Sequence, residues 1–138
     1  MNKISPLKYS LKVKDNYLSV TVSGHFSLTE AKLMYTAALE SLLTNELTKL
    51  FIDAFKVKGK VTTIERYYFG EFAAYESLKY MKSGLKRIAV TIYGEEPIID
   101  PRRFGEIVAR NRGLNLKVTT DKNESLKFLG IREKSKSK

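Results

Sequence analysis

The sequence predicts a single α/β domain with a mixed sheet of five strands, in the chain order β-β-α-β-α-β-α-β-α, and with the helices packed on the sheet. Three observations predict this fold. Two runs of alternating apolar and polar residues open the chain and indicate an antiparallel hairpin. Segments with helical spacing of apolar residues then alternate with short β-rich runs. Because strand–helix–strand units usually form right-handed parallel crossovers, we expect the later strands to be parallel.

The hairpin is predicted from residues 8–14 and 17–23, which both alternate apolar and polar side chains. A period of two is typical of strands with one buried face. Asp15-Asn16 between the two runs is a two-residue turn signal, and Gly24 ends the second run. The chain should therefore begin with two paired strands.

The first helix should begin at Ser27-Leu28-Thr29-Glu30, a capping box in which the serine hydroxyl accepts an N–H and the glutamate reaches back. Apolar residues follow at helical spacing and fade near Asn45. Residues 47–54 form a nearly unbroken apolar run, which is typical of a strand buried on both faces.

The second helix should begin at a similar capping box, Thr62-Thr63-Ile64-Glu65. Large apolar residues after it predict an inward-facing stripe. Its members are Ile64, Tyr67, Tyr68, Phe72, Tyr75 and Leu78. Phe69, Ala73 and Tyr80 lie roughly opposite this stripe and would form a second packing surface or, in our interpretation, a homodimer interface.

The remaining elements follow from local signals. Residues 88–92 are β-rich and predict a central strand, and 116–119 predict the last strand. Asp100-Pro101 predicts a helix start, with Gly113 beyond the end of that helix. A short helix should open near Asp121. We expect the domain to span 1–130 and a disordered basic tail to span 131–138.

Composition limits the class of protein. The chain has no cysteine, so disulfides and thiolate metal sites are excluded. No segment predicts a membrane helix or a signal peptide, and we expect a cytoplasmic protein without metal or cofactor. The formal charge of +10 suits an acidic partner or an anion, or serves solubility alone. No RNP, zinc-finger or helix-turn-helix pattern predicts specific nucleic-acid binding.

Several stretches carry a family resemblance by their order and spacing. They are Gly24-His25-Phe26-Ser27, Leu50-Phe51-Ile52-Asp53, Arg87-Ile88-Ala89-Val90, and Phe104 through Gly113, with Asp100 before it and Val118-Thr119-Thr120-Asp121 after it. Over about residues 8–130 the chain resembles STAS domains, the anti-sigma-factor-antagonist fold, and more narrowly the SpoIIAA-like (STAS/Sec14-type) family of small bacterial proteins of largely unassigned function.

The resemblance has implications for function. In STAS antagonists a Ser or Thr at the start of the second helix is phosphorylated by a partner kinase, and Thr62 falls on that position. Val61 stands where the family pattern has an acidic residue, and Ile64 where it has glycine. In Sec14-like relatives the same fold encloses a lipid, although this chain lacks their lid helices.

The loop before the second helix is the predicted binding site. A helix N-terminus favours an anion, and the loop adds lysines. The predicted site residues are Lys56, Lys58, Lys60, Thr62 and Thr63. The sequence therefore favours a non-enzymatic regulatory or binding module that meets a protein partner or a small anionic ligand there. A capped helix after a solvated lysine loop is the structural alternative.

Two other functions stay open. The chain could carry a small apolar or lipid-like ligand between the second helix and the sheet, in a pocket of ~300 Å³ or more. That pocket would be formed by Tyr67, Tyr68, Phe72 and Tyr75. It could instead be an acid/base enzyme that uses Glu71 or Asp53. His25 is the single histidine and is interpreted as a loop residue.

Overall fold

The structure is a computed structural model that describes residues 5–131. The element order is the predicted one. The elements are β1 (Lys8–Val13), β2 (Leu18–His25), α1 (Leu28–Asn45), β3 (Lys49–Lys58), α2 (Thr63–Lys82), β4 (Ala89–Tyr93), α3 (Phe104–Asn111), β5 (Asn115–Thr119) and α4 (Lys122–Phe128). Apart from Ile131, the predicted tail at 131–138 lies outside the described residues.

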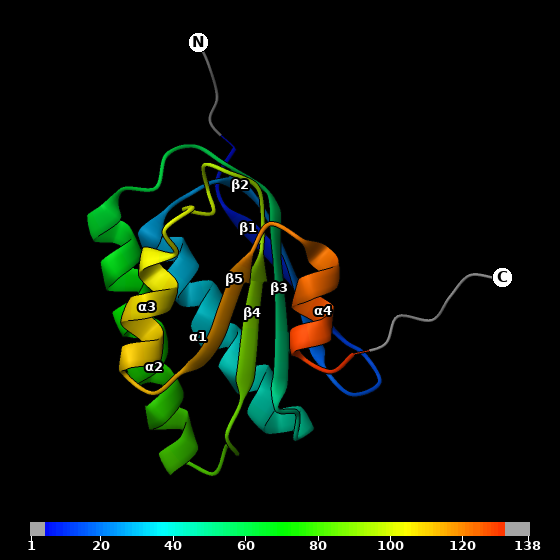
Figure 1. The fold of residues 1–138 in the computed structure, drawn as a ribbon. Coiled ribbons are helices and arrows are strands. Elements are labelled where there is room, and N and C mark those ends of the chain that lie inside the picture. The colour runs from blue at the N-terminus through cyan, green and yellow to red at the C-terminus, as the bar shows by residue number, and fades with distance from the viewer. Residues whose placement is uncertain (1–4, 132–138) are drawn as a thin grey trace, which may run out of the picture.

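The five strands form one sheet in the order β1-β2-β3-β4-β5. The β1–β2 pair is antiparallel, and the other three pairs are parallel. The predicted turn at Asp15-Asn16 is closed by a hydrogen bond from the Lys14 N–H to the Tyr17 carbonyl. Figure 1 shows α1, α2 and α3 on one side of the sheet and α4 alone on the other. The prediction of a mixed α/β sheet is therefore confirmed.

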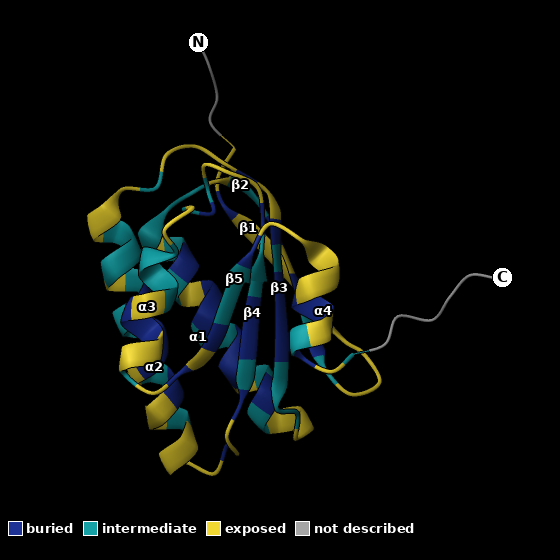
Figure 2. Ribbon diagram, in the orientation of Figure 1, coloured by how far each residue is buried: buried dark blue, intermediate teal, exposed yellow. Residues whose placement is uncertain are grey.

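The main core lies between the sheet and the three-helix layer, where the structure is dark blue in Figure 2. Tyr35 of α1 is fully buried there, with its hydroxyl 2.7 Å from the Ser77 hydroxyl of α2. Burial raises the pKa of Tyr35, so this side chain is neutral in the fold. Its ring meets the ring of Phe69 edge-on, with centroids 5.9 Å apart. These contacts join α1 to α2.

A smaller core lies under α4 on the other face of the sheet. Phe51 of β3 packs there with Leu126 and Leu129, and Ile131 packs against the same cluster. Thr91 of β4 donates a hydrogen bond of 3.0 Å to the buried Ser125 hydroxyl. The short helix is thus held by apolar contacts and by one buried polar pair.

The predicted inward face of α2 is only partly the face that the structure buries. The inward residues are small: Gly70, Ala73, Ala74 and Ser77 are buried. A Cβ atom at position 70 would lie only 2.6 Å from the Gly105 carbonyl oxygen of α3. The two helix backbones approach too closely for large side chains at this crossing. The prediction that the large apolar residues face inward is therefore wrong for Ile64, Tyr68, Tyr75 and Leu78, which are exposed, whereas Phe72 packs against the core as predicted.

The start of α3 also differs from the prediction. The helix begins at Phe104 rather than at Pro101, and Arg103 before it has a left-handed backbone with φ 55°. The Asp100 carboxylate accepts the N–H groups of Arg102 and Phe104, each at 3.2 Å. Asp100 therefore caps the helix start as predicted, but across a turn of non-helical residues.

Side chains of α3 cover the outer edge of β5. The Val118 N–H donates to the Glu106 carboxylate at 2.6 Å, and the Val118 carbonyl accepts from Arg103 Nε at 2.7 Å. The Leu116 carbonyl accepts from Arg110 at 2.9 Å. An open strand edge invites pairing with another chain, and these bonds block it.

Candidate functional site

The capping box at the start of α2 is present as predicted. Thr62 is the N-cap residue, and its hydroxyl oxygen accepts the Glu65 N–H at 3.2 Å. The Glu65 carboxylate accepts the Thr62 N–H at 2.9 Å and the Thr62 hydroxyl at 3.1 Å. The box therefore occupies two backbone donors that an anion at this helix end would otherwise use. A carboxylate next to the Thr62 hydroxyl also opposes an anion there.

The predicted lysines do not all lie at the helix start. The third strand continues to Lys58, beyond the predicted end at Ala54, after a register shift in its pairing with β2. Lys56 and Lys58 consequently line a hollow of about 340 Å³ together with Lys8 and His25. None of Lys60, Thr62 and Thr63 lines this hollow.

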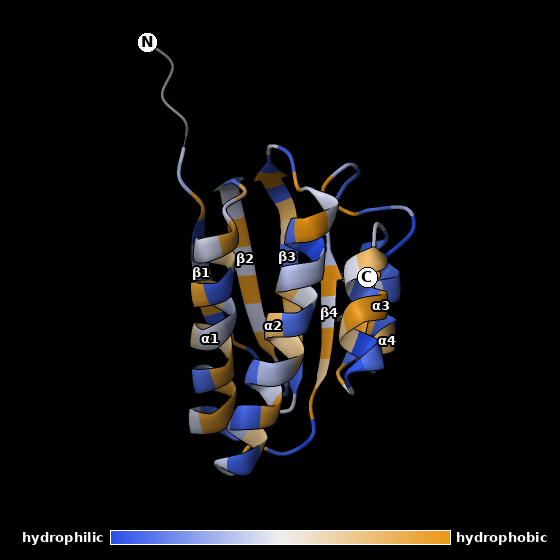
Figure 3. Cartoon of the chain, turned by 90° about the vertical axis from the view of Figure 1, so that its left-hand side faces the viewer, coloured by the Kyte–Doolittle hydropathy of each residue, from blue (hydrophilic) through white to orange (hydrophobic). Residues whose placement is uncertain are grey.

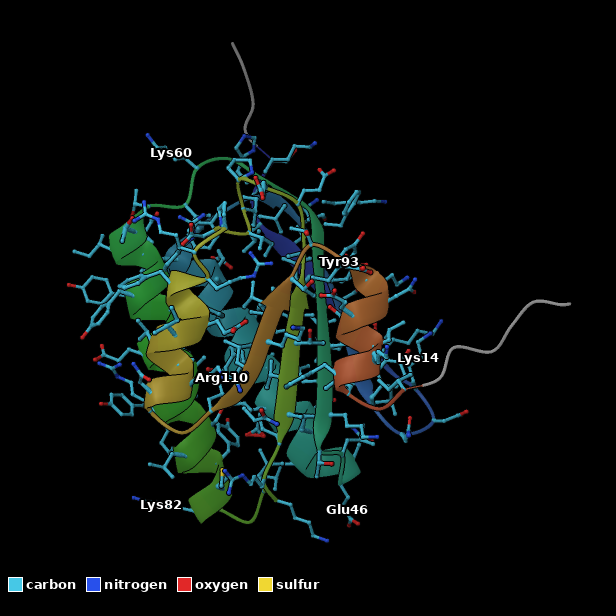
Figure 4. The ribbon with its side chains drawn as sticks, in the orientation of Figure 1. Lys14, Glu46, Lys60, Lys82, Tyr93 and Arg110 are labelled. Carbon is cyan, nitrogen blue, oxygen red and sulfur yellow. The ribbon has the colours of Figure 1, made fainter. Side chains whose placement is uncertain are left out.

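Lys60, Thr62 and Thr63 remain exposed in the loop and at the helix start. Figure 4 shows Lys60 on the connection above α2. The predicted binding set is thus divided between two places on the surface.

Arg66 holds the loop before α2 in place, a role that was not predicted from the sequence. Its guanidinium donates to the Val61 carbonyl at 2.7 Å and to the Pro97 and Ile98 carbonyls at 2.6 and 3.1 Å. These bonds tie the loop before α2 to the loop before α3. No local sequence signal identifies such a contact, because the acceptors are backbone groups about 30 residues away in the chain.

An apolar stripe runs along the outer face of α2. We call it the outer stripe; its members are Ile64, Tyr68, Glu71, Tyr75 and Leu78. Its four apolar side chains are exposed by 60% (Ile64), 45% (Tyr68), 55% (Tyr75) and 47% (Leu78). Figure 3 looks onto the helical layer that carries this face, and α2 crosses it between α1 and α3. These residues were predicted to face the core.

Glu71 in the middle of the outer stripe is neutralised within the chain. Its carboxylate lies 3.6 Å from the Arg112 guanidinium and accepts the Tyr67 hydroxyl at 3.3 Å. Arg112 also lies over the Tyr67 ring, 5.4 Å from the centroid. This small network joins α2 to Arg112, the residue that follows α3.

The residues predicted as a homodimer interface face the core instead. Ala73 is buried, and Phe69 and Tyr80 pack against the main core. The Tyr80 hydroxyl bonds to Glu40 of α1 at 3.1 Å. These side chains contact α1 and the core, so they do not form an exposed apolar row like the outer stripe.

An apolar cavity of about 130 Å³ lies beneath the N-terminal half of α2. It is lined by the sheet residues Ile52, Ile92 and Val118 and by Phe69 and Gly70 of the helix. Charged side chains stand among its lining residues, namely Glu65, Arg66, Asp100, Arg103 and Glu106. The predicted pocket residues Tyr67, Tyr68, Phe72 and Tyr75 do not line it. The sequence predicted the location of this cavity, between α2 and the sheet, but not the residues that line it. The cavity volume is below the ~300 Å³ expected of a carrier.

The two carboxylates considered for acid/base chemistry lie apart from this cavity. Glu71 is in the outer stripe, and Asp53 lies within β3, where its carboxylate accepts the Phe55 N–H at 3.0 Å. In the cavity lining, Asp100 has a pKa below its ordinary value. Partial burial acts to raise this pKa, but the bonds from Phe104 and Arg102 and the charge of Arg66 outweigh it. Asp100 is therefore ionised at neutral pH.

Within residues 5–131, no helix has the length and apolar character needed to cross a membrane. No group of acidic or histidine side chains in this part of the chain is arranged to hold a metal ion.

Comparison with known proteins identifies the fold. No family model matches the chain, and no curated protein matches it. Among solved structures, an anti-sigma factor antagonist from Mycobacterium paratuberculosis is similar, with a TM-score of 0.51 and 14% identity, over 91% of this chain and 95% of that one. An uncharacterized protein of the DUF3478 family with a SpoIIAA-like fold, from Shewanella loihica PV-4, has a TM-score of 0.51 and 19% identity, over 94% and 98%.

These similarities define the class of structure. The chain has the STAS-like, SpoIIAA-like fold over most of its length, as the sequence resemblance predicted. At this level of identity, function must be argued from the surfaces of the chain itself.

Proposed function

We propose that this chain is a non-enzymatic regulatory module that binds a protein partner through the outer stripe of α2 and the loop residues Lys60, Thr62 and Thr63. The fold supports this proposal, because one structure that shares it is named for action on another protein, an anti-sigma factor. A protein partner also agrees with the extended, convex shape of a helix face better than a small ligand does.

The observation that carries the proposal is the exposure of four large apolar side chains on one face of one helix. Single exposed apolar residues are ordinary, but a row of them on a rigid element is typical of an interaction surface. Two of the four are tyrosines, which are enriched at the energetic centres of protein interfaces. The row begins beside Thr62, so the helix start and the stripe form one continuous surface.

Site-specific photo-crosslinking tests this proposal. A benzophenone amino acid in place of Tyr68 or Tyr75 should give covalent adducts with another protein in cells that contain the natural partner. The same group in place of Leu33 of α1, which is 54% exposed, is the matched control and should give none. Equal adducts at all three positions, or none at the two stripe positions, would contradict the proposal.

Phosphorylation of Thr62 would give this module a switch. A phosphate adds a charge of about −1.5 to −2. The phosphate ester would remove the hydroxyl proton that Thr62 now donates to the Glu65 carboxylate, and the phosphate charge would repel that carboxylate. The capping box would then open at the edge of the binding surface, where the partner would detect the change.

A second function, transport or sensing of a small apolar ligand, is favoured by the cavity beneath α2. Its volume of about 130 Å³ is close to that of an engineered apolar cavity of ~150 Å³ that binds benzene. Methyl NMR during titration with benzene tests this function. The Ile52 and Ile92 methyl signals, from the cavity lining, should shift, while those of Leu126 under α4 should not. Unchanged spectra up to benzene saturation would exclude such a ligand.

A further inference from the structure

We propose that the partner presents an acidic amphipathic helix that packs lengthwise along the outer stripe of α2. This inference rests on the proposed function and adds the chemistry of the partner. The spacing within the stripe is four, three, four and three residues, which is the spacing of the contact seam between two packed helices. From Ile64 to Leu78 the stripe offers such a seam over ~21 Å of the helix.

The lysines around the outer stripe favour an acidic partner. Figure 4 shows Lys60 and Lys82 at opposite ends of α2. Lys79 adds a further positive charge near the C-terminal end, although Glu76 lies 3.3 Å from it. The carboxylate inside the stripe, Glu71, is already paired with Arg112 and offers nothing to a basic partner. The face is therefore apolar along its length with a lysine beyond each end, so that acidic residues of a docking helix placed against Lys60 and Lys82, away from the Glu65 carboxylate, complement it.

A second copy of this chain fits the surface poorly. In an antiparallel pair of α2 helices, Lys60 of one copy would lie near Lys82 of the other. In a parallel pair, each lysine would meet its own equivalent. The formal charge of +10 adds long-range repulsion between copies. Self-association on this face therefore lacks the charge complementarity that an acidic helix provides.

An anionic membrane would also attract lysines and apolar side chains. The ion pair in the middle of the stripe argues against it. Side chains of Arg112 and Glu71 are 26% and 30% exposed, so they would enter the apolar boundary of a bilayer together with their neighbours. Polar groups are costly there, whereas helix–helix seams accommodate a single polar position. A protein helix is therefore the better occupant.

Two synthetic peptides test the inference. Both are about 20 residues long, with leucine at the seam positions and alanine elsewhere, and they carry either glutamate or lysine at the flanking positions. Fluorescence anisotropy with the full chain should show binding of the glutamate peptide at least about tenfold tighter than that of the lysine peptide. This preference should fall as salt increases.

Variants of the chain locate the contact. Tyr75→Ser should abolish binding of the glutamate peptide, and Lys60→Glu combined with Lys82→Glu should weaken it about tenfold. Leu33→Ser is the matched surface control and should leave binding unchanged. Circular dichroism melting of each variant shows that the fold is kept. Equal binding of both peptides, or binding that is insensitive to Tyr75→Ser, would overturn the inference.

The remaining outcomes distinguish this inference from the proposed function. Protein adducts at Tyr68 and Tyr75, with no binding of the glutamate peptide, would overturn the acidic helix and leave a partner-binding module. An absence of adducts at both positions would overturn the two together. A dimer in sedimentation that Tyr75→Ser abolishes, or cosedimentation with phosphatidylcholine–phosphatidylglycerol vesicles at moderate salt, would assign the face to a second copy or to a membrane, against the inference.

Discussion

The two long helices that cover the same side of the sheet use their large side chains in opposite ways. In α1 the large residues Met34, Tyr35, Leu39 and Leu42 face inward and fill the core. In α2 the fully buried residues are small, Phe69, Phe72 and Tyr80 are only partly buried against the core, and four other large residues form the outer stripe. The difference follows from what each helix packs against, since α1 lies on the strands while α2 is held chiefly by α1 and α3.

This comparison explains two features of the candidate site together. Because α2 approaches α3 through Gly70 and Gly105, the position of Gly70 cannot carry a side chain. Small residues leave the apolar cavity between the helix and the sheet. Ile64, Tyr68, Tyr75 and Leu78 instead face solvent. The exposed stripe and the cavity thus lie on opposite sides of one closely packed helix.

The largest expected effect is on that crossing. Gly70→Ala would place a methyl group 2.6 Å from the Gly105 carbonyl, and α2 and α3 would have to separate. We expect a loss of about 3 kcal/mol in the free energy of unfolding, measured by urea denaturation. Tyr75→Ala on the outer face should cost about 0.5 kcal/mol or less. Similar losses for both variants would mean that the two faces of α2 do not differ in this way.

The buried contact between α1 and α2 should give the next largest effect. Tyr35→Phe removes the hydroxyl that bonds to Ser77 and leaves the serine hydroxyl buried without that partner. We expect a loss of about 1–2 kcal/mol in the free energy of unfolding. Adding Ser77→Ala to this variant should cost much less than Ser77→Ala costs alone. Strictly additive losses in this double-mutant cycle would show that the two hydroxyls do not interact.

A smaller effect is expected at the start of α2. Thr62→Ala removes the N-cap oxygen that accepts the Glu65 N–H and should lower stability by about 1 kcal/mol. Thr62→Glu imitates a phosphate and should cost at least as much, because it adds a second carboxylate beside Glu65. Thermal unfolding measures both, and Thr63→Ala is the neighbouring control. Identical crosslinking yields at Tyr68 with Ala, Glu and Thr at position 62 would count against a phospho-switch.

The smallest effect concerns pH. The pKa of Asp100 is lowered in the fold, so its contribution to stability is complete above the pKa of the unfolded chain, ~3.9, and is lost as pH falls through the lower folded pKa. The melting temperature of wild type should therefore exceed that of Asp100→Asn at pH 6. The difference should shrink as pH is lowered below about 4. A constant difference down to pH 2 would contradict this role for the carboxylate.

Local signals in the sequence determined the order of the elements. The serine cap of α1, the capping box of α2, the turn at Asp15-Asn16 and the apolar run that becomes β3 involve residues within a few positions of each other. The interactions that define these elements join neighbours in the chain and need no tertiary contacts. The sequence alone was therefore sufficient to predict them. The same is true of the alternation that predicts a parallel sheet after the hairpin.

Tertiary structure decided which face of α2 is buried, how far β3 extends and where the cavity lies. Helical periodicity groups residues onto faces, but it does not say which face meets the core when both carry apolar residues. Here the contact between Gly70 and the α3 backbone made that choice. A backbone approach between segments 35 residues apart leaves no mark in local sequence, because it depends on the space that other elements leave free.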